Sequence, residues 1–383
     1  MLVFLHLLGW VSAGVALVGA GYAALAAVLV SRFMRAEHPL PSCFPPVTVL
    51  KPLYRGEPGL SQNLETFFAQ DYPGEVQLVF GVHDEADPAI DVVKALQTRY
   101  PGRDTAVIAN PAIYGANAKV SNLINMLPAA RHETLILSDS DIAVPRQWLR
   151  QVTSALERPG IGIVTCLYTG EPQHGERRLW SSLAAMGTSY EFLPNAVLGT
   201  SLGLTTPCFG STIALKRTVL DEVGGFNAFA DYLADDYEMG RAVREHGYGL
   251  AMPAMGVSHT AAEASAAELF RHELRWTRTI RLVNPIGHLG SIVTFGFPFA
   301  VLSAFLTGFS LPSLWVLALT LAARLFLKQR IDGIFGTYAG PYWLLPVRDL
   351  LSFAVFVTSL FGETVHWRGT RFAVAPSGAM SQS

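Results

Sequence analysis

The chain has 383 residues, of which 50% are hydrophobic and only 15% are charged. An average soluble protein carries about 25% charged residues, so this composition indicates a large apolar part and excludes a disordered chain. The net charge is -2, from 28 basic and 30 acidic residues without a basic block, which argues against a nucleic-acid-binding protein.

The first apolar segment lies at the start of the chain, where residues 7–31 carry no charged side chain. At about 1.5 Å per residue, this run can cross a hydrocarbon core of about 30 Å. A signal peptide is the weaker alternative, because no basic segment precedes the run and no clear cleavage site follows it. Arg32 and Arg35 come next, so the positive-inside rule places the residues after the run in the cytoplasm. We predict an N-terminal transmembrane helix over residues 1–35.

A soluble domain over residues 36–281 follows, in which short apolar runs alternate with helical patterns. Strands are expected at 47–50, 76–82, 105–109, 134–137 and 162–167, and helices at 63–69, 88–100, 117–127 and 145–156. This alternation predicts an α/β fold with a mostly parallel sheet and helices on both faces. Ligands of such sheets bind at the carboxyl ends of the strands.

Acidic residues occupy those strand ends. Asp84 follows the second strand, and Asp139 and Asp141 follow the fourth. Two carboxylates two residues apart can present oxygen atoms to Mg²⁺ or Mn²⁺, which complete their coordination with water and phosphate oxygens. The alternative is a solvated loop or a helix cap, where Asp is common.

The sequence has no phosphate-binding glycine motif after its first strand, so neither a dinucleotide site of the usual kind nor a P-loop is supported. A phosphate-containing ligand would instead be bound by a metal ion and a basic side chain. Lys119 opens a helix after Gly115 and is a candidate for binding a diphosphate, the alternative being a capped surface helix.

Two further segments carry candidate residues. Adjacent Asp235 and Asp236 start a helix, where Asp is a common cap, but a carboxylate with a raised pKa could also act as a general base. On a later helix, Arg275 could pair with phosphate. Trp276 could stack on a sugar or anchor the helix at the membrane surface. Residues 179–204 are apolar and are read either as an interfacial segment or as ordinary core helix.

The end of the chain is again apolar. Residues 282–323 are uncharged and long enough for two spans, so we predict a transmembrane hairpin over 282–330, with helices at about 289–308 and 312–327. Arg324, Lys328 and Arg330 would return the chain to the cytoplasm. The remaining region, 331–383, holds a third apolar segment at 341–362 that contains Arg348 and Asp349. This segment is read as spanning or re-entrant.

Taken together, these motifs resemble the membrane-bound glycosyltransferases related to family 2 and, within them, the ceramide glucosyltransferase family, family 21. The resemblance runs from Leu50 to about Arg281 and rests on several short stretches. These are Leu50–Leu53, Asn63–Phe68, Asp71–Pro73, Asp87–Val92, Lys119–Leu123, Val219–Asp221, Gly224–Gly225, Ala234–Tyr237, Arg275–Thr277 and Trp367–Gly369. Two others, Pro207–Thr212 and His272–Arg281, look most like the bacterial branch linked to hopanoid biosynthesis.

The resemblance implies a GT-A glycosyltransferase domain and a role for each residue of the family pattern. Asp84 would contact uridine. Asp139, with Asp141, would form the metal and diphosphate site, and Asp236 would be the catalytic base. Arg275 and Trp276 match the last motif, although His272 stands where the family has Gln or Arg. In the matching stretches, Lys51, Lys119 and Asn122 are further candidates for the donor site.

The activity implied is an inverting transfer of a sugar, with N-acetylglucosamine favoured, from a UDP-sugar to a membrane lipid hydroxyl, with Mg²⁺ or Mn²⁺ as cofactor. Bacteriohopanetetrol is the expected acceptor, and a ceramide that receives glucose is the alternative. The implied location is the bacterial inner membrane, as a multi-pass protein whose catalytic domain faces the cytoplasm. A non-enzymatic membrane scaffold is the rival class, but a scaffold has no need of three acidic sites at strand and helix ends.

Overall fold

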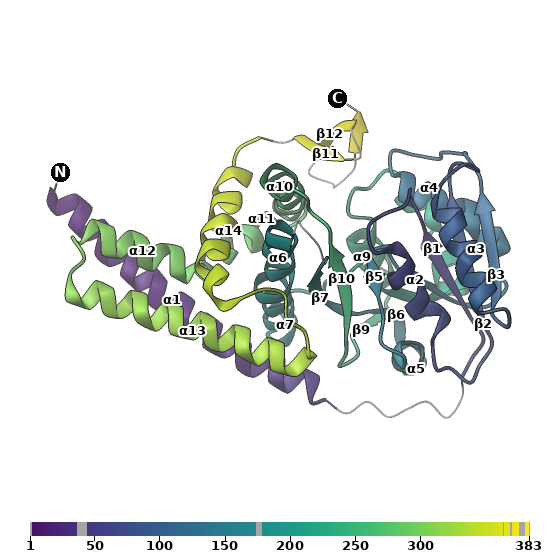
Figure 1. Ribbon diagram of the computed structural model, residues 1–383, viewed down its shortest axis with the longest axis horizontal. Helices are drawn as coiled ribbons and strands as arrows, with labels where there is room; N and C mark the ends of the chain where they lie inside the picture. Colours follow the sequence, from purple (N-terminus) through teal and green to yellow (C-terminus); the bar gives the residue numbers. More distant parts are fainter. Residues whose placement is uncertain are drawn as a thin grey trace. The chain divides into compact units, whose positions relative to one another are not determined.

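The computed structural model describes residues 2–36, 44–173, 178–362, 364–367, 370–374 and 380–382, so Arg368 and Gly369 of the last matching stretch lie outside the described residues. Its elements group into two compact units, each discontinuous in sequence (Figure 1). The sheet unit comprises Ala36–Thr169, Thr205–Ala262 and Gly378–Ser383. The helical unit comprises Met1–Arg35, Gly170–Leu204 and Glu263–Ser377.

The sheet unit is built on a seven-stranded sheet with the order β3-β2-β1-β4-β8-β6-β9. Its strands are β1 (Val47–Pro52), β2 (Val76–Val82), β3 (Asp104–Ala109), β4 (Thr134–Leu137), β6 (Ile161–Thr165), β8 (Ile213–Lys216) and β9 (Gly249–Ala251). Neighbouring strands among β3, β2, β1 and β4 pair in parallel, as do β6 and β9, whereas β8 runs antiparallel to β4 and β6. The predicted α/β fold with a mostly parallel sheet is confirmed. Strand direction cannot be inferred from the four residues of β8, so its reversal is a finding of the structure.

Helices cover both faces of this sheet, as the alternating pattern predicts. On one face, α2 (Leu60–Phe68), α3 (Ala89–Arg99) and α5 (Trp148–Leu156) enclose a core that includes Val49. On the other, α4 (Ala118–Met126), α8 (Arg217–Glu222) and α9 (Asp235–Glu245) enclose a core that includes Leu50. Val49 and Leu50 are adjacent in β1 but lie in different cores, because successive side chains of a strand point to opposite faces. Short 3₁₀ turns η1 (Leu127–Ala129) and η3 (Phe226–Phe229) complete this second layer.

A smaller sheet with the order β5-β10-β7 accompanies the main one. Its strands are β5 (Ile142–Ala143), β7 (Leu167–Pro172) and β10 (Gly256–Ala261). Strand β10 pairs antiparallel with β5, and His259 stands opposite Ile142. This pairing brings a late segment of the chain to the loop that carries Asp139 and Asp141.

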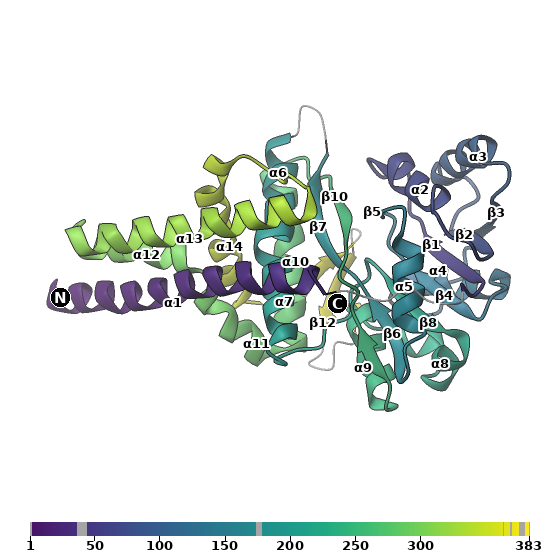
Figure 2. The ribbon, with the colours of Figure 1, turned by 90° about the horizontal axis from the view of Figure 1, so that it is seen from below.

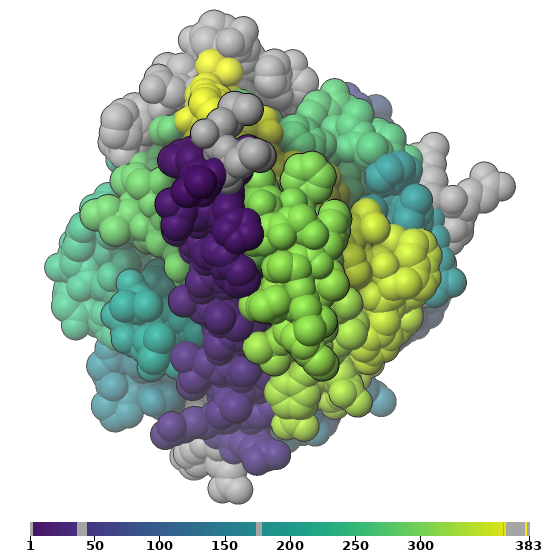
Figure 3. Space-filling model, turned by 90° about the vertical axis from the view of Figure 1, so that its left-hand side faces the viewer, coloured from purple at the N-terminus to yellow at the C-terminus, as the bar shows by residue number. Residues whose placement is uncertain are grey.

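The helical unit is organised around α1 (Leu2–Met34), which packs against α12 (Gly296–Leu306) and α13 (Leu311–Phe335) (Figure 2). In Figure 3, α1 in purple lies alongside α13 in green. The backbones of α1 and α12 come close together at Gly19 and Gly296. Glycine is required there, because a Cβ atom on Gly19 would lie 2.4 Å from the Cα atom of Gly296. The other elements are α6 (Arg178–Gly187), η2 (Thr188–Phe192, a π-helix), α7 (Leu193–Ser201), α10 (Ala266–Val283), α11 (Pro285–Gly290), η4 (Ser291–Thr294), η5 (Tyr342–Leu344) and α14 (Leu345–Ser359).

Short strands end the chain. In the helical unit, β11 (Thr364–Trp367) pairs antiparallel with β12 (Thr370–Val374). In the sheet unit, β13 (Met380–Gln382) begins with a hydrogen bond of 2.7 Å from the Met380 amide to the carbonyl oxygen of Asp231.

Among the described residues, two helices are long and apolar enough to cross a membrane, Val3–Met34 and Leu311–Phe335. A third span is present if the bent pair Pro285–Thr294 and Gly296–Leu306 counts as one, with its bend of 58°. The first arm of the expected hairpin is therefore broken rather than straight. The break comes just before Pro298, whose ring and missing N–H disfavour a continuous helix.

The charged residues of the last apolar regions lie inside the helical unit. Arg324 and Asp349 are 5% and 6% exposed and form a two-bonded ion pair, with N–O distances of 2.9 and 2.6 Å. Arg348 pairs with Glu273, and Lys328 is fully buried beside Asp332. Arg324 and Lys328 thus have their partners within the unit, and their expected place on the cytoplasmic side stays a prediction. Whether α14 spans the membrane stays a prediction.

Candidate active site

Several polar side chains gather at the carboxyl edge of the main sheet. Strands β1 and β4 pair in parallel, so their carboxyl ends meet, and Lys51 and Asp139 come from these ends. Helices α4 and α9 start at the same edge and bring Lys119, Asp235 and Asp236. The structure thus brings together residues that are far apart in the sequence.

Lys119 forms the centre of this group. Its Nζ atom lies 2.8 Å from Oδ1 of Asp139 and 3.2 Å from Oδ2 of Asp235. The lysine and Asp235 side chains are only 16% and 8% exposed, whereas Asp139 is 34% exposed. Burial opposes the charge of Lys119, but the carboxylates of Asp139 and Asp235 outweigh it and raise the pKa of the lysine. Lys119 is therefore a fixed positive charge at this edge.

Asp236 lies next to that charge and is held by backbone amides. The amide of Gly210 donates to its Oδ2 atom at 2.9 Å, and the amide of Tyr237 donates to Oδ1 at 2.8 Å. Burial and the negative charge of Asp235 raise the pKa of Asp236 to about 6. A carboxylate with such a pKa is ionised at neutral pH and still accepts protons readily, as a general base must.

Gly210 connects the two acidic positions. Its carbonyl oxygen accepts a hydrogen bond of 3.2 Å from the Asp139 amide, while its own amide bonds to Asp236. A Cβ atom here would lie 2.5 Å from Oδ2 of Asp139 and 3.1 Å from Nζ of Lys119. Only glycine leaves space at this point. The sequence reading did not single out Gly210, because its role depends on this approach in space.

Lys51 is fully buried, and its contacts are with neighbouring parts of the sheet unit. Its ammonium group donates to the carbonyl oxygen of Asp139 and, at 3.4 Å, to Oγ of Ser138, and it lies 3.9 Å from the centre of the Phe67 ring. Burial lowers the pKa of Lys51 to about 7. These contacts make Lys51 a positioning residue for the loop that follows β4.

Asp141 is paired with a residue from β10. Its Oδ2 atom lies 3.2 Å from Nε2 of His259, and its carbonyl oxygen accepts a hydrogen bond of 2.8 Å from the amide of Thr260. The histidine side chain is 10% exposed and the Asp141 side chain 41%. From the sequence, His259 could be a metal ligand, but a lone histidine is more often a structural residue, and no spacing signal links it to Asp141.

The donor set fits a divalent cation that takes few protein ligands. Asp139 and Asp141 both expose carboxylate oxygens, which are the ligands that Mg²⁺ and Mn²⁺ prefer. In the described part of the chain, no group of three or more His, Cys, Asp and Glu side chains is arranged to hold a metal ion. Water and the oxygens of a phosphate ligand would therefore have to complete the coordination.

Asp84 and Asn122 have other contacts. Asp84 is exposed, and its Oδ1 atom accepts a hydrogen bond of 2.9 Å from the amide of Ala86 in the turn after β2. Asn122 is buried and donates to the carbonyl oxygen of Gly81 at 2.7 Å. Both hold the end of β2 rather than joining the ion pair of Lys119 with Asp139.

Arg275 and Trp276 belong to α10 of the helical unit, whereas the acidic residues belong to the sheet unit. The ring of Trp276 packs edge-on against His272, with 4.5 Å between centroids. His272 in turn has its Nδ1 atom 2.6 Å from Oε1 of Glu263. The residue that departs from the family motif therefore orients the tryptophan and is itself held by a carboxylate.

Comparisons with known proteins identify the family to which the chain belongs. Residues 11–380 match the family described as Glycosyl transferase family 21. Ceramide glucosyltransferase 1 of Caenorhabditis elegans is 27% identical over 350 residues, which cover 88% of this chain and 74% of that protein. Ceramide glucosyltransferase 3 of the same organism is 25% identical over 355 residues, with the same coverage.

A similar fold is known from a solved structure, that of the mannosyltransferase PcManGT of Pyrobaculum calidifontis in complex with GDP-Man and Mn²⁺. The TM-score is 0.51 at 20% identity, and the match covers 92% of this chain and 99% of that one. This likeness supports the GT-A-like fold. The family match identifies the chain as a sugar-transferring enzyme, so the membrane-scaffold alternative falls away.

Proposed function

Because this chain belongs to glycosyl transferase family 21, we propose that it transfers glucose from UDP-glucose to the primary hydroxyl of a ceramide. The support for this pair is the similarity to two ceramide glucosyltransferases across 88% of the chain. The motif resemblance to hopanoid enzymes, with bacteriohopanetetrol and N-acetylglucosamine, has no counterpart among these relatives. We therefore place the ceramide reaction first.

Asp236 is the proposed catalytic base, and its geometry is the observation that carries the proposal. Two backbone amides fix both of its oxygens, at 2.9 and 2.8 Å, so its carboxylate cannot rotate away. Its pKa of about 6 suits removal of a proton from an alcohol as that alcohol attacks.

The reaction balances as a single displacement. The ceramide oxygen bonds to the anomeric carbon, its proton moves to Asp236, and the bond from that carbon to UDP breaks. Attack on the face opposite the leaving group inverts the configuration, so an α-linked donor gives a β-glucoside. UDP takes the bonding electron pair, and its growing negative charge must be stabilised.

We assign that stabilisation to the ion-paired group at the carboxyl edge of the sheet. Lys119 carries a fixed positive charge next to Asp139, and the Asp139 and Asp141 oxygens are the proposed metal ligands. When bound, Mg²⁺ or Mn²⁺ supplies positive charge to the diphosphate. Asp84 is the proposed uridine contact, and Asn122 holds the strand end from which Asp84 projects.

The remaining assignments are proposals about the wider chain. Arg275 would bind the leaving diphosphate, and Trp276 would contact the sugar or acceptor. Residues 36–281 would form the transferase domain, with 179–204 at the membrane surface, between the N-terminal span and the segments 282–330 and 331–383. The protein would lie in the bacterial inner membrane as a multi-pass protein with this domain in the cytoplasm.

The test is turnover of the purified full-length protein in phosphatidylcholine nanodiscs. UDP-glucose with ceramide should release UDP and form glucosylceramide in equal amounts. UDP-N-acetylglucosamine with bacteriohopanetetrol is the parallel assay. Product in the second assay alone would replace the ceramide proposal by the hopanoid one, and no product in either would overturn both.

A further inference from the structure

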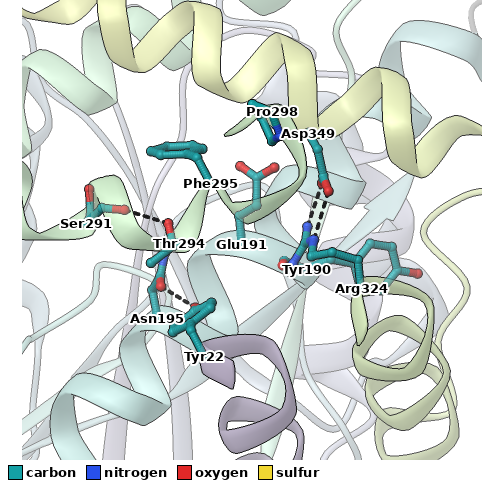
Figure 4. Close-up of a pocket in the computed structure, with 10 residues that line it drawn as sticks. All are labelled: Tyr22, Tyr190, Glu191, Asn195, Ser291, Thr294, Phe295, Pro298, Arg324 and Asp349. Atoms are coloured by element: carbon teal, nitrogen blue, oxygen red, sulfur yellow. Dashed lines mark hydrogen bonds and ion pairs between the residues drawn. The ribbon is translucent and has the colours of Figure 1, made fainter. Parts of the chain in front are cut away.

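The helical unit contains a pocket whose empty volume is about 400 Å³, open space at its mouth included. Its walls come from α1, η2, α7, η4, α12, α13 and α14, and Figure 4 shows the side chains that face it. Among the described residues, helices α1 and α13, and the bent α11–α12 segment if it counts as one span, are apolar enough to cross a membrane. Most of the residues that line the pocket are nevertheless polar. Such groups are costly in an apolar environment unless they have polar partners.

The ion pair of Arg324 with Asp349 forms one wall, and the polar atoms of this pair already have hydrogen-bond partners. Arg324 donates to both oxygens of Asp349 and, at 2.9 Å, to the carbonyl oxygen of Tyr190. Figure 4 shows the carboxylate of Glu191 between Phe295 and Asp349. Its Oε1 atom accepts a hydrogen bond of 2.5 Å from the hydroxyl of Ser352, but its contacts with Arg348 are 3.4 and 3.5 Å long, whereas Arg348 bonds closely to Glu273. Among the residues that the structure describes, Oε2 of Glu191 therefore has no close charged partner.

The charges around the pocket do not cancel. Counted as ionised, Glu191, Asp349 and Glu273 carry three negative charges and Arg324 and Arg348 two positive ones, which leaves one negative charge, although burial raises the pKa of Glu191. An anionic phosphate head group would therefore be repelled. An uncharged group that donates hydrogen bonds would be attracted to Glu191, because bonds to ionised acceptors are about twice as strong as neutral ones.

The opposite wall offers a donor. The hydroxyl of Tyr22 donates to Oδ1 of Asn195, so the amide of Asn195 is fixed with its NH₂ group as the remaining donor. Phe295 and Pro298 supply apolar surface beside these polar groups. The pocket thus pairs an acceptor and a donor with a small apolar face, beside segments that can lie in a bilayer.

We propose that this pocket binds the lipid acceptor through an uncharged part of its head group that does not react: a hydroxyl other than the attacking one donates to Glu191, and an oxygen accepts from Asn195. Naming the ligand as the acceptor rests on the proposed function. The non-reacting hydroxyl and the amide of a ceramide have this chemistry, and so do the non-reacting hydroxyls of bacteriohopanetetrol. Phospholipids with a net negative charge do not.

Binding can be measured apart from turnover with a ceramide that carries a photoactivatable diazirine in its acyl chain. In phosphatidylcholine nanodiscs, we expect cross-links on peptides from α1, α7 and α12, and loss of these cross-links with unlabelled ceramide or bacteriohopanetetrol. The competitor that acts at lower concentration identifies the source of the head group. Equal competition by phosphatidylglycerol, or cross-links elsewhere only, would overturn the proposal.

Glu191→Gln is the matched variant, and Glu273→Gln is its control, because both residues contact Arg348 but only Glu191 lines the pocket. Glu191→Gln should raise the KM for the lipid at least about fivefold and leave the KM for the UDP-sugar unchanged. Glu273→Gln should change neither KM by more than about twofold, because Glu273 does not line the pocket, although breaking its buried ion pair with Arg348 should lower the stability of the protein. Equal effects of the two variants would reduce Glu191 to a structural partner of Arg348. If the competitors abolish the cross-links but the protein transfers no sugar, the proposed function is contradicted and the proposal of a lipid pocket still holds.

Discussion

Nζ of Lys119 lies 2.8 Å from Oδ1 of Asp139, so a basic and an acidic residue with separate expected roles form one ion pair. The lysine is the candidate for the diphosphate and the aspartate the candidate for the metal. In the protein alone each neutralises the other, which lets two charges stand at the edge of an apolar core. Donor binding would then exchange this internal pair for contacts with the diphosphate and its cation.

Asp236→Asn should lower kcat by about 10²–10⁴-fold, because the amide keeps the shape of the side chain but cannot accept a proton. UDP binding, measured by calorimetry, should persist. Asp235→Asn is the control: its carboxylate bonds to Lys119 and Asn117 rather than to Gly210, so the loss in kcat should be smaller. A dead Asp235→Asn beside an active Asp236→Asn would reverse the assignment of the base.

The pH profile of kcat should show an acidic limb with an apparent pKa of about 6. Below this value Asp236 is protonated and cannot take the proton of the acceptor, so the rate should rise about tenfold per pH unit as the pH increases toward 6, and then level off. Asp236→Asn should retain only its low residual rate without this limb. A profile with an unchanged limb in the variant would assign the titration to another group.

EDTA should abolish transfer, and Mn²⁺ or Mg²⁺ should restore it, because the exposed oxygens of Asp139 and Asp141 need a cation to meet the diphosphate. Asp139→Asn should lose at least about a hundredfold in kcat/KM, and Asp141→Asn should lose less. Asp71→Asn, which removes only an exposed ion pair with Arg150, is the matched control. Full activity in EDTA, with no metal retained in elemental analysis, would contradict the site.

Lys119→Met should lower the free energy of unfolding by about 3–5 kcal/mol, because it leaves two buried or half-buried carboxylates without their cation. Urea unfolding of the detergent-solubilised protein, followed by tryptophan fluorescence, measures this change. Lys94→Met, on the exposed face of α3, should change stability by less than about 0.5 kcal/mol. Equal stability of the two variants would mean that the Lys119 pair contributes little to the fold.

Membrane orientation can be tested with single cysteines, because native Cys166 and Cys208 are buried and burial raises the pKa of both thiols. With Cys43 replaced by serine, Lys94→Cys should resist an impermeant maleimide in intact cells and react after permeabilisation. Phe309→Cys, in the exposed turn between α12 and α13, should react in intact cells. The reverse pattern would place the sheet unit outside the cytoplasm.

The fold was predictable to the extent that it depends on local pattern. Buried parallel strands such as β1 and β2 appear as continuous apolar runs, and Asn117 caps α4 where the helix was expected to begin. Strand β8 and the pairing of β10 with β5 were not predictable, because strand order and direction depend on contacts between distant segments.

The candidate site shows the same limit. The motif positions of Asp139 and Asp236 could be found in the sequence, since each follows or begins a clear element. The contacts of Gly210 and His259 could not, because each is created by a loop or strand that reaches the site from far along the chain. The family resemblance implied Lys51 as a donor-site candidate, but its complete burial against Phe67 is visible only in the structure.

The ion pair between Arg324 and Asp349 also constrains the order of biogenesis. The two residues are 25 positions apart, so α13 leaves the ribosome before the carboxylate that neutralises its arginine. A lone arginine at the centre of an inserting helix costs about 2.5–3.5 kcal/mol on the translocon scale. If α13 spans the membrane as we propose, its insertion proceeds against this penalty until α14 docks. Docking of α14 would then hold α13 in the bilayer.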